Sequence, residues 1–256
     1  MDWHLDTGLV CGLYGLATGV LVPALIARIP EPDPEDPAAE VGEEDVSPLD
    51  DETVAPRPVE EPKELYADIA ATRGLRWRAG VTTGAVAFAV GSAVGWSWAL
   101  TFLMYLVPVG VALAVVDWRT RLLPTKVIAP SYAVVGALAA LSAWAEGDLD
   151  ALVTAGLGWL VAGGTFFALW FVYPRGMGYG DVRLSGVLGI ALGYLGWSEL
   201  LVGVYAGFIL GGVGGLLLSV LRIVDRKAYP FGPFMLVGAV VGVLAGPYVA
   251  DWYTYP

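Results

Sequence analysis

The sequence predicts an all-α protein, a polytopic membrane helix bundle with about eight transmembrane helices. Of its 256 residues, 57% are hydrophobic and 34 are glycine, which together make roughly 70% apolar residues against about 45–50% in a soluble domain. Charged residues make up 15%, and 21 of the 39 charges lie between residues 28 and 78. A soluble globule needs polar surface on every side, so this composition and this distribution of charge exclude one.

Eight stretches have the length and apolar character of a spanning helix, which needs about 20 residues. The first lacks the basic flank of a secretion signal, so we interpret residues 1–29 as an N-terminal transmembrane anchor. Between the second and third, residues 95–98 are expected to form a very tight turn. The eight stretches lie near 7–27, 79–96, 98–116, 127–145, 150–172, 182–197, 199–221 and 232–250.

The basic residues are confined to one side of this arrangement. With eight alternating spans, all fourteen fall in the insert 28–78 and in three loops on the same side, whereas acids such as Asp148 and Glu199 fall on the other, where we expect solvated loops. Positive residues mark the cytoplasmic face, so the sequence predicts a multi-pass protein of the inner membrane with both termini outside. The fourteen are Arg28, Arg57, Lys63, Arg73, Arg76, Arg78, Arg119, Arg121, Lys126, Arg175, Arg183, Arg222, Arg226 and Lys227.

The insert divides into two parts. Residues 30–62 are rich in proline and acid and nearly free of large apolar residues, a composition that cannot bury enough surface to fold. We expect a disordered acidic cytoplasmic linker, with an acidic docking tail as the alternative. Residues 63–78 have mixed charge and some apolar spacing, which predicts a short interfacial helix. Residues 79–256 then form a seven-helix membrane domain.

Several classes of function are excluded by what the sequence contains. It has no clustered basic face of the kind that binds nucleic acid. One cysteine (Cys11) and one histidine (His4) leave no material for a disulfide or a multi-cysteine zinc site, so we expect no metal and no cofactor. Glycines spaced four residues apart, as in 207–215 and 238–246, predict close helix packing inside one bundle in preference to a dimer interface.

Two aspartates are candidates for chemistry because carboxylates near a membrane are costly. Asp117 follows the apolar run of the third span, and Asp181 stands where the chain re-enters the membrane for the sixth, so both lie on the same side at similar depth. If they are close, one holds a proton while the other is ionised, as in aspartic proteases. In the alternative, Arg119 or Arg121 pairs with Asp117, and Arg183 with Asp181.

Three short segments surround these aspartates. Asp117 is followed seven residues later by Pro124, glycines precede Asp181 at Gly178 and Gly180, and the last span starts with the sequence 230–233 (Pro230, Phe231, Gly232, Pro233). In this order the segments resemble those of the type IV prepilin leader peptidases, membrane aspartyl proteases of the GxGD class. The similarity covers roughly 79–250.

The resemblance implies cleavage of the leader of prepilins or pseudopilins at the cytoplasmic face, in the service of type IV pilus assembly or protein secretion. Asp117 and Asp181 would be the catalytic pair, activating water. Gly178, Gly180, Pro124, Pro230, Gly232 and Pro233 would shape the loops that position the substrate. The partners expected are therefore the lipid bilayer and a prepilin-like precursor, and no nucleic acid.

Two departures from the family pattern are visible. Thr125 follows the loop proline, where the family often has Asp or Asn, and this difference is expected to tune the loop. Larger members also carry a four-cysteine zinc site, associated with N-methylation, where this chain has its acidic insert. The sequence therefore predicts a short form without methyltransferase activity. A proton-coupled transporter, which also uses paired carboxylates, and a non-catalytic assembly scaffold are the alternatives.

Overall fold

The structure is a computed structural model that describes residues 3–31, 64–174, 177–220 and 230–254. Within these ranges the chain forms α-helices and no strands, which confirms the predicted all-α fold. Five helices are long and apolar enough to cross a membrane. They are α6 (Leu100–Thr120), α7 (Thr125–Glu146), α8 (Asp150–Val172), α10 (Trp197–Val220) and α11 (Gly232–Thr254).

The other predicted spans are helical but do not meet the criteria of length and apolar composition for crossing a membrane. The second and sixth correspond to α5 (Leu75–Val94) and α9 (Tyr179–Leu195), and the first is divided into α1 (Leu5–Gly19) and α2 (Val22–Ile26). α1 and α9 have 15 and 17 residues, fewer than the ~20 that a straight crossing needs. α5 carries two arginines, Arg76 and Arg78, among its first four residues. Length and composition thus support five crossings, and the number eight stays a prediction.

The insert is described only at its two ends. The predicted linker 30–62 lies outside the described residues apart from Pro30 and Glu31. Within 63–78, α4 (Tyr66–Ala71) is a separate short helix, and 75–78 already belong to α5. Gly74 separates the two with φ of 83°, in the left-handed region that glycine adopts at low cost. The segment 63–78, predicted to form one interfacial helix, therefore contains a short helix, a turn at Gly74 and the start of α5, and its interfacial position stays a prediction.

The tight turn expected at 95–98 is present between α5 and α6. Gly95 has φ of 71°, and a Cβ built there would lie 2.6 Å from Cδ2 of the His4 ring. Glycine is favoured at this position because it accepts the left-handed angle and lets the ring approach the backbone. His4 also donates its backbone N–H to the Ser92 carbonyl at 2.9 Å. This end of α1 is thereby fixed against α5.

Three antiparallel helix pairs dominate the packing: α1 with α5, α8 with α9, and α10 with α11. In the last pair, a Cβ on Gly238 would lie 2.4 Å from the Gly207 backbone nitrogen. In the α8–α9 pair, a Cβ on Gly189 would lie 2.4 Å from the Gly158 carbonyl oxygen. Small residues let helix backbones approach in this way, and the predicted packing of glycines within one bundle is confirmed.

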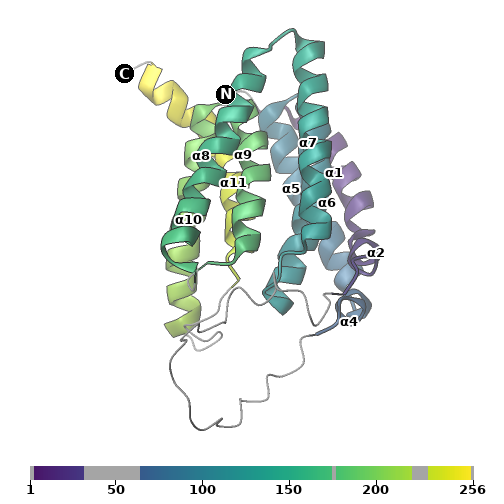
Figure 1. The fold of residues 1–256 in the computed structure, drawn as a ribbon. Helices are drawn as coiled ribbons and strands as arrows, with labels where there is room; N and C mark the ends of the chain where they lie inside the picture. The colour runs from purple at the N-terminus through teal and green to yellow at the C-terminus, as the bar shows by residue number, and fades with distance from the viewer. Residues whose placement is uncertain (1–2, 32–63, 175–176, 221–229, 255–256) are drawn as a thin grey trace.

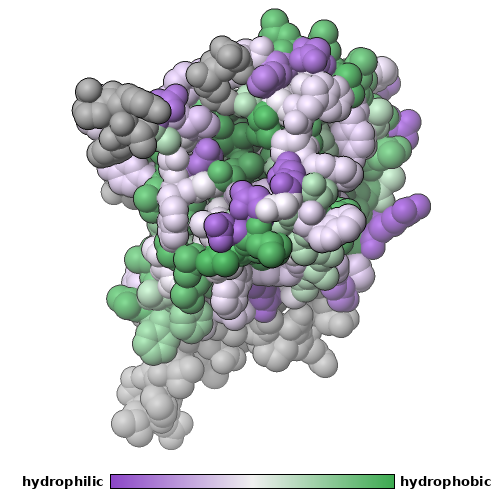
Figure 2. All heavy atoms as spheres, turned by 90° about the horizontal axis from the view of Figure 1, so that it is seen from above, coloured by the Kyte–Doolittle hydropathy of each residue, from purple (hydrophilic) through white to green (hydrophobic). Residues whose placement is uncertain are grey.

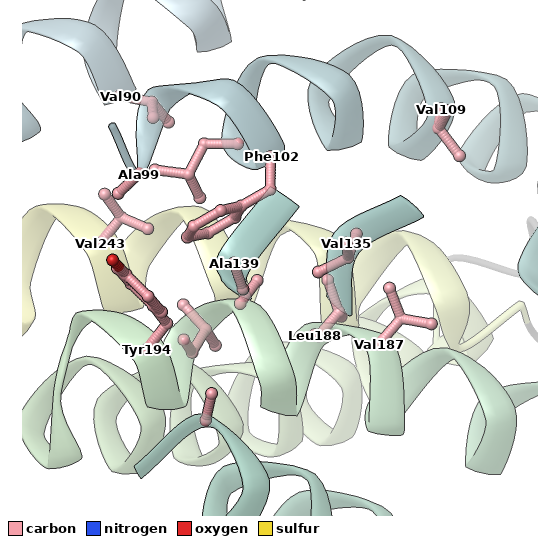
Figure 3. Close-up of a cluster of buried hydrophobic side chains, with 14 of the residues drawn as sticks. Val90, Ala99, Phe102, Val109, Val135, Ala139, Val187, Leu188, Tyr194 and Val243 are labelled. Atoms are coloured by element: carbon pink, nitrogen blue, oxygen red, sulfur yellow. The ribbon is translucent and has the colours of Figure 1, made fainter. Parts of the chain in front are cut away.

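The pairs are arranged in two halves that meet along one surface, called the seam below. Figure 1 shows α1, α5, α6 and α7 on one side and α8 to α11 on the other. Across the seam, α9 packs against α7, and α11 packs against α6. Apolar side chains from both halves fill it, as Figure 3 shows for Phe102, Val135, Leu188 and Val243. The Tyr194 ring meets Phe102 edge-on, with the ring centroids 5.1 Å apart.

A carboxylate ties the halves together at the end of the bundle that holds the α5–α6 turn. Oε1 of Glu146 accepts hydrogen bonds from the Ser97 hydroxyl (3.0 Å) and the Trp98 amide (2.9 Å), and its Oε2 accepts one from the Tyr194 hydroxyl (3.1 Å). Figure 2, which views this end, shows hydrophilic side chains scattered around apolar ones. Such a mixture is expected where helix ends reach a membrane surface.

Candidate active site

Asp117 and Asp181 lie at the end of the bundle opposite the α5–α6 turn. Asp117 stands in the last turn of α6, and Asp181 in the first turn of α9. Their side chains are buried, with 4% and 7% of their surface exposed, and they are close enough for their charges to interact. Because α6 and α9 belong to different halves, the pair sits on the seam. The structure thus brings together the two residues that the sequence singled out.

Asp117 is held by the first residue of α11. The Gly232 backbone N–H donates a hydrogen bond of 3.0 Å to Oδ2 of Asp117. A Cβ on Gly232 would lie only 2.7 Å from the same oxygen, so this approach requires a residue without a side chain. A helix N-terminus favours negative charge. Pro230, which is buried, and Pro233 lie on either side of the glycine. Because the proline ring fixes φ, these two residues restrict the backbone where α11 begins.

Asp181 is held by the glycines that precede it. Gly178 is the N-cap of α9, and its carbonyl accepts the Asp181 amide at 3.0 Å. A Cβ built on Gly178 would lie 3.5 Å from Oδ2 of Asp181, so the carboxylate folds back over the cap. Gly180 packs against Leu123, whose Cβ would be 2.7 Å from a Cβ on the glycine. Both glycines therefore stand where a neighbour approaches closely.

The arginines of this face have other partners. Arg119 forms an ion pair with Glu64, with its Nε 2.7 Å from Oε2, and this hydrogen bond holds the pKa of the Glu64 carboxyl below its usual value. Arg183 donates to the Thr125 hydroxyl, and its guanidinium carbon lies 4.6 Å from the Tyr179 ring centroid. In the part of the chain that the structure describes, no ion pair joins an arginine to Asp117 or Asp181, contrary to the alternative considered from the sequence.

The loop that follows Asp117 connects the two halves of the site. Pro124 is the N-cap of α7, and Thr125 directly after it accepts the hydrogen bond from Arg183, two residues beyond Asp181. Tyr132, two turns further along α7, donates its hydroxyl to the Arg183 carbonyl at 2.6 Å. No sequence pattern predicts these contacts. They join residues 51 and 58 positions apart, and only the packing of α7 on α9 brings them together.

The described residues contain no group of three or more His, Cys, Asp or Glu that could hold a metal ion. The acids that were expected in solvated loops on the outer face differ in part from that expectation. Glu199 is half-buried, with its side chain against Gly246, and it accepts a hydrogen bond from the Ser198 hydroxyl at 3.1 Å, so it is not a freely solvated loop residue. Asp148 is exposed, as expected, and its Oδ1 accepts a hydrogen bond from the Ala151 amide in the first turn of α8 at 3.2 Å.

The fold and the site define a multi-pass helical membrane protein with a buried pair of aspartates between two halves. Residues 104–216 match the type IV leader peptidase family. The matched stretch includes Asp117, Pro124, Gly178, Gly180 and Asp181, and the resemblance to prepilin leader peptidases is confirmed.

Several known proteins are similar to the chain, each named prepilin leader peptidase/N-methyltransferase. The protein of Aeromonas hydrophila is 28% identical over 179 residues, which is 67% of this chain and 58% of the relative. That of Escherichia coli (strain K12) is 30% identical over 149 residues, 56% of this chain and 60% of the relative. That of Pectobacterium carotovorum is 33% identical over 141 residues, 52% and 47% respectively. The chain thus spans about half the length of the curated relatives it matches. No solved structure matches it.

Proposed function

We propose that the protein is a prepilin peptidase, a membrane aspartic endopeptidase that removes the leader peptide of type IV prepilin-like or pseudopilin precursors. The observation that carries the proposal is the buried pair Asp117 and Asp181 within the stretch that matches the type IV leader peptidase family. The relatives named prepilin leader peptidase/N-methyltransferase support the same substrate class.

The two aspartates divide the work of acid and base. Two like charges in a buried site are unfavourable together, so the resting pair carries one proton. The Gly232 N–H, 3.0 Å from Oδ2 of Asp117, stabilises negative charge on that residue. Asp117 is therefore the base that takes a proton from water, and Asp181 is the acid.

The reaction follows from this division. As Asp117 removes a proton, the water oxygen attacks the scissile carbonyl carbon, and Asp181 gives its proton to the carbonyl oxygen. The resulting tetrahedral diol collapses when the C–N bond breaks: the proton held by Asp117 passes to the leaving amine, and Asp181 takes back a proton from one diol hydroxyl as the carbonyl re-forms. Water is consumed, one carboxyl and one amine are formed, and the pair regains its single shared proton.

The active site is proposed to face the cytoplasm. Arg119 and Arg183 lie within two residues of Asp117 and Asp181, and positive residues favour the cytoplasmic side. The acids Asp6, Glu146 and Asp148 lie at the other end of the bundle, with the α5–α6 turn. A precursor would reach the pair with its leader at the inner face and its apolar segment in the bilayer.

The experiment that tests the function is co-expression with a prepilin-like precursor, with loss of the leader followed on a gel. Asp117→Asn and Asp181→Asn should each abolish cleavage at unchanged protein level. The double variant should be no worse than either single one, because the two residues act as a unit. Asp150→Asn, an exposed acid at the other end of the bundle, serves as the control and should cleave normally.

The pH dependence gives a second readout of the same pair. Only the singly protonated pair is active, so the rate should fall at low pH, where both carboxyls are protonated, and at high pH, where both are ionised. Cleavage at near-normal rate by either single variant would refute the paired mechanism. Loss of cleavage accompanied by loss of folded protein would assign the aspartates a structural role.

A further inference from the structure

The short segment 121–124 between α6 and α7, called the connector, lies between the two halves of the site. α6 ends where Arg121 adopts φ of 57°, a left-handed angle that is uncommon outside glycine, and its amide bonds back to the Asp117 carbonyl at 2.8 Å. This turn directs the chain from Asp117 across the seam toward α9. Leu123, the third residue of the connector, is half-buried there and packs against the apolar core.

Leu123 contacts the glycine beside each aspartate. Its Cβ lies 2.7 Å, and its Cδ1 3.5 Å, from where a Cβ on Gly180 would stand, and Gly180 directly precedes Asp181. Its Cδ1 also lies 3.4 Å from where a Cβ on Gly232 would stand, and Gly232 donates the amide that holds Asp117. One apolar side chain thus fills the space between the two backbone segments that present the pair.

We propose that Leu123 is a positioning residue whose side chain sets the separation between the Asp117 and Asp181 carboxylates. The glycines on either side have no side chain of their own, so the bulk of Leu123 determines how closely the first turns of α9 and α11 approach the end of α6. The proposal rests on the proposed peptidase function, because the geometry of the pair matters through the reaction.

Other contacts hold the start of α9 against α7 and α8. Thr125 and Tyr132 hold Arg183 against α7, and the Trp170 ring of α8 lies against the Tyr179 ring, with centroids 4.9 Å apart. None of these side chains is among the nearest atoms to a Cβ built on Gly180 or Gly232. With α9 held laterally, removal of the Leu123 side chain lets Gly180 and Gly232 move toward each other, and Asp181 shifts relative to Asp117. A misplacement of about 1 Å in a catalytic group can cost about 100-fold in rate.

The first test varies the size of this side chain in the purified full-length protein. Leu123→Ala should lower kcat for a prepilin substrate by about tenfold or more with KM changed by less than about threefold, because the reacting groups move and the substrate-binding surface does not. Leu123→Met should recover at least about a third of the rate, because it conserves volume. Leu122→Ala, in the same connector, is the matched control. It should leave kcat unchanged, because Leu122 is not among the nearest atoms to either glycine.

The second test uses the contact with Gly180. A Cβ added there would meet the Cβ of Leu123 itself, so Gly180→Ala should cost about tenfold or more in kcat. Leu123→Ala keeps that Cβ and should not relieve the clash. In a Leu123→Gly background, however, Gly180→Ala should add less than about twofold. Equal effects of Gly180→Ala in all three backgrounds would overturn the proposed contact.

Failure of the proposed function and failure of this inference are distinguishable. A wild-type protein that cleaves no prepilin refutes the function. The distance between positions 117 and 181 is then followed by oxidative cross-linking of an Asp117→Cys, Asp181→Cys variant in a Cys11→Ser background. Adding Leu123→Ala to this variant should change the rate of disulfide cross-linking several-fold. The positioning role is overturned if Leu123→Ala has the wild-type kcat per folded molecule. It is also overturned if Leu123→Ala leaves the rate of cross-linking unchanged.

Discussion

Gly232 serves Asp117 in two ways that depend on its having no side chain. Its amide donates a hydrogen bond to the carboxylate at 3.0 Å, and its Cα leaves that oxygen the space which a Cβ would occupy. Helix propensity ranks alanine above glycine, so it does not account for a glycine as the first residue of α11. The glycine is therefore explained by the approach of Asp117.

This gives a prediction at the residue scale. In Gly232→Ala the new methyl group would lie 2.7 Å from Oδ2 of Asp117, so the carboxylate is displaced from its amide donor. We expect kcat/KM for leader cleavage to fall by about tenfold or more. Gly136→Ala in α7, where no atom lies within 4 Å of the added Cβ, is the control. Equal activity of the two variants would contradict the proposed role of Gly232.

At the same scale, the sequence predicted Asp117, Asp181 and the glycines near them because charged residues at the ends of apolar runs are visible without a structure. Leu123 could not be predicted, because an apolar residue in a short loop has no distinctive pattern. The partnership of Thr125 with Arg183, 58 positions away, depends on how α7 packs on α9. This contact also gives Thr125 a role. Its hydroxyl accepts the hydrogen bond from Arg183 at a position where the family that the sequence resembles often has Asp or Asn.

At the scale of elements, hydropathy located the helices well, and backbone chemistry explains the main exception. The first predicted span is broken after Gly19, and Pro23 stands at the start of α2. Proline has no N–H for the preceding turn, which makes it suited to a first helical turn and unsuited to an interior. Pro108, Pro130 and Pro247, by contrast, lie inside their helices, as membrane helices tolerate.

Glu146 is the element-scale contact for which we predict a measurable effect. It joins the end of α7 to the α5–α6 turn and, through Tyr194, to the end of α9. Hydrogen bonds to a charged group contribute about 1.5–3 kcal/mol each when buried, and less here because Glu146 is exposed. Glu146→Ala should lower the thermal unfolding temperature of the detergent-solubilised protein, whereas Asp150→Ala should not. Identical unfolding curves for the two variants would show that Glu146 contributes nothing.

At the scale of the whole molecule, the division into two halves explains why the aspartate pair lies on the seam. α6 supplies Asp117 from one half, whereas α9 and α11 supply Asp181 and the Gly232 amide from the other. The pair is complete only when the halves are packed together. The sequence predicted that both aspartates share one end of the bundle. It could not predict the division into halves, because this depends on helix pairing among segments of similar composition.

The orientation of the molecule is a whole-molecule prediction. If all fourteen basic residues are cytoplasmic, as eight crossings require, a reporter fused after residue 256 should behave as external, and one inserted within 35–60 as cytoplasmic. The helices α1, α5 and α9 are the ones whose crossing the prediction adds to the five longer spans. A cytoplasmic reporter after residue 256, together with a cytoplasmic one within 35–60, would contradict this prediction, because it would show that an even number of helices cross between the two positions.

The relatives suggest a second activity whose presence in this chain can be tested. They are named for both leader peptidase and N-methyltransferase, yet the chain covers only 58% and 60% of two of them. A methyltransferase needs a folded pocket that places a methyl donor against the new amine. The insert between the first two predicted spans has the composition least suited to a core, and the only cysteine, Cys11, lies in α1 and is buried.

We therefore predict that this chain alone yields mature substrate with a free, unmethylated N-terminus. The measurement is mass spectrometry of the N-terminal peptide after co-expression in cells that contain no other prepilin methyltransferase, with unprocessed precursor from the Asp181→Asn variant as the reference. A mass higher by one methyl group would place the transfer site among the membrane helices. The half-buried carboxylate of Glu199 and the buried hydroxyls of Thr7, Thr83 and Ser92 would then be the first polar groups to examine, because the remaining interior of the described bundle is predominantly apolar.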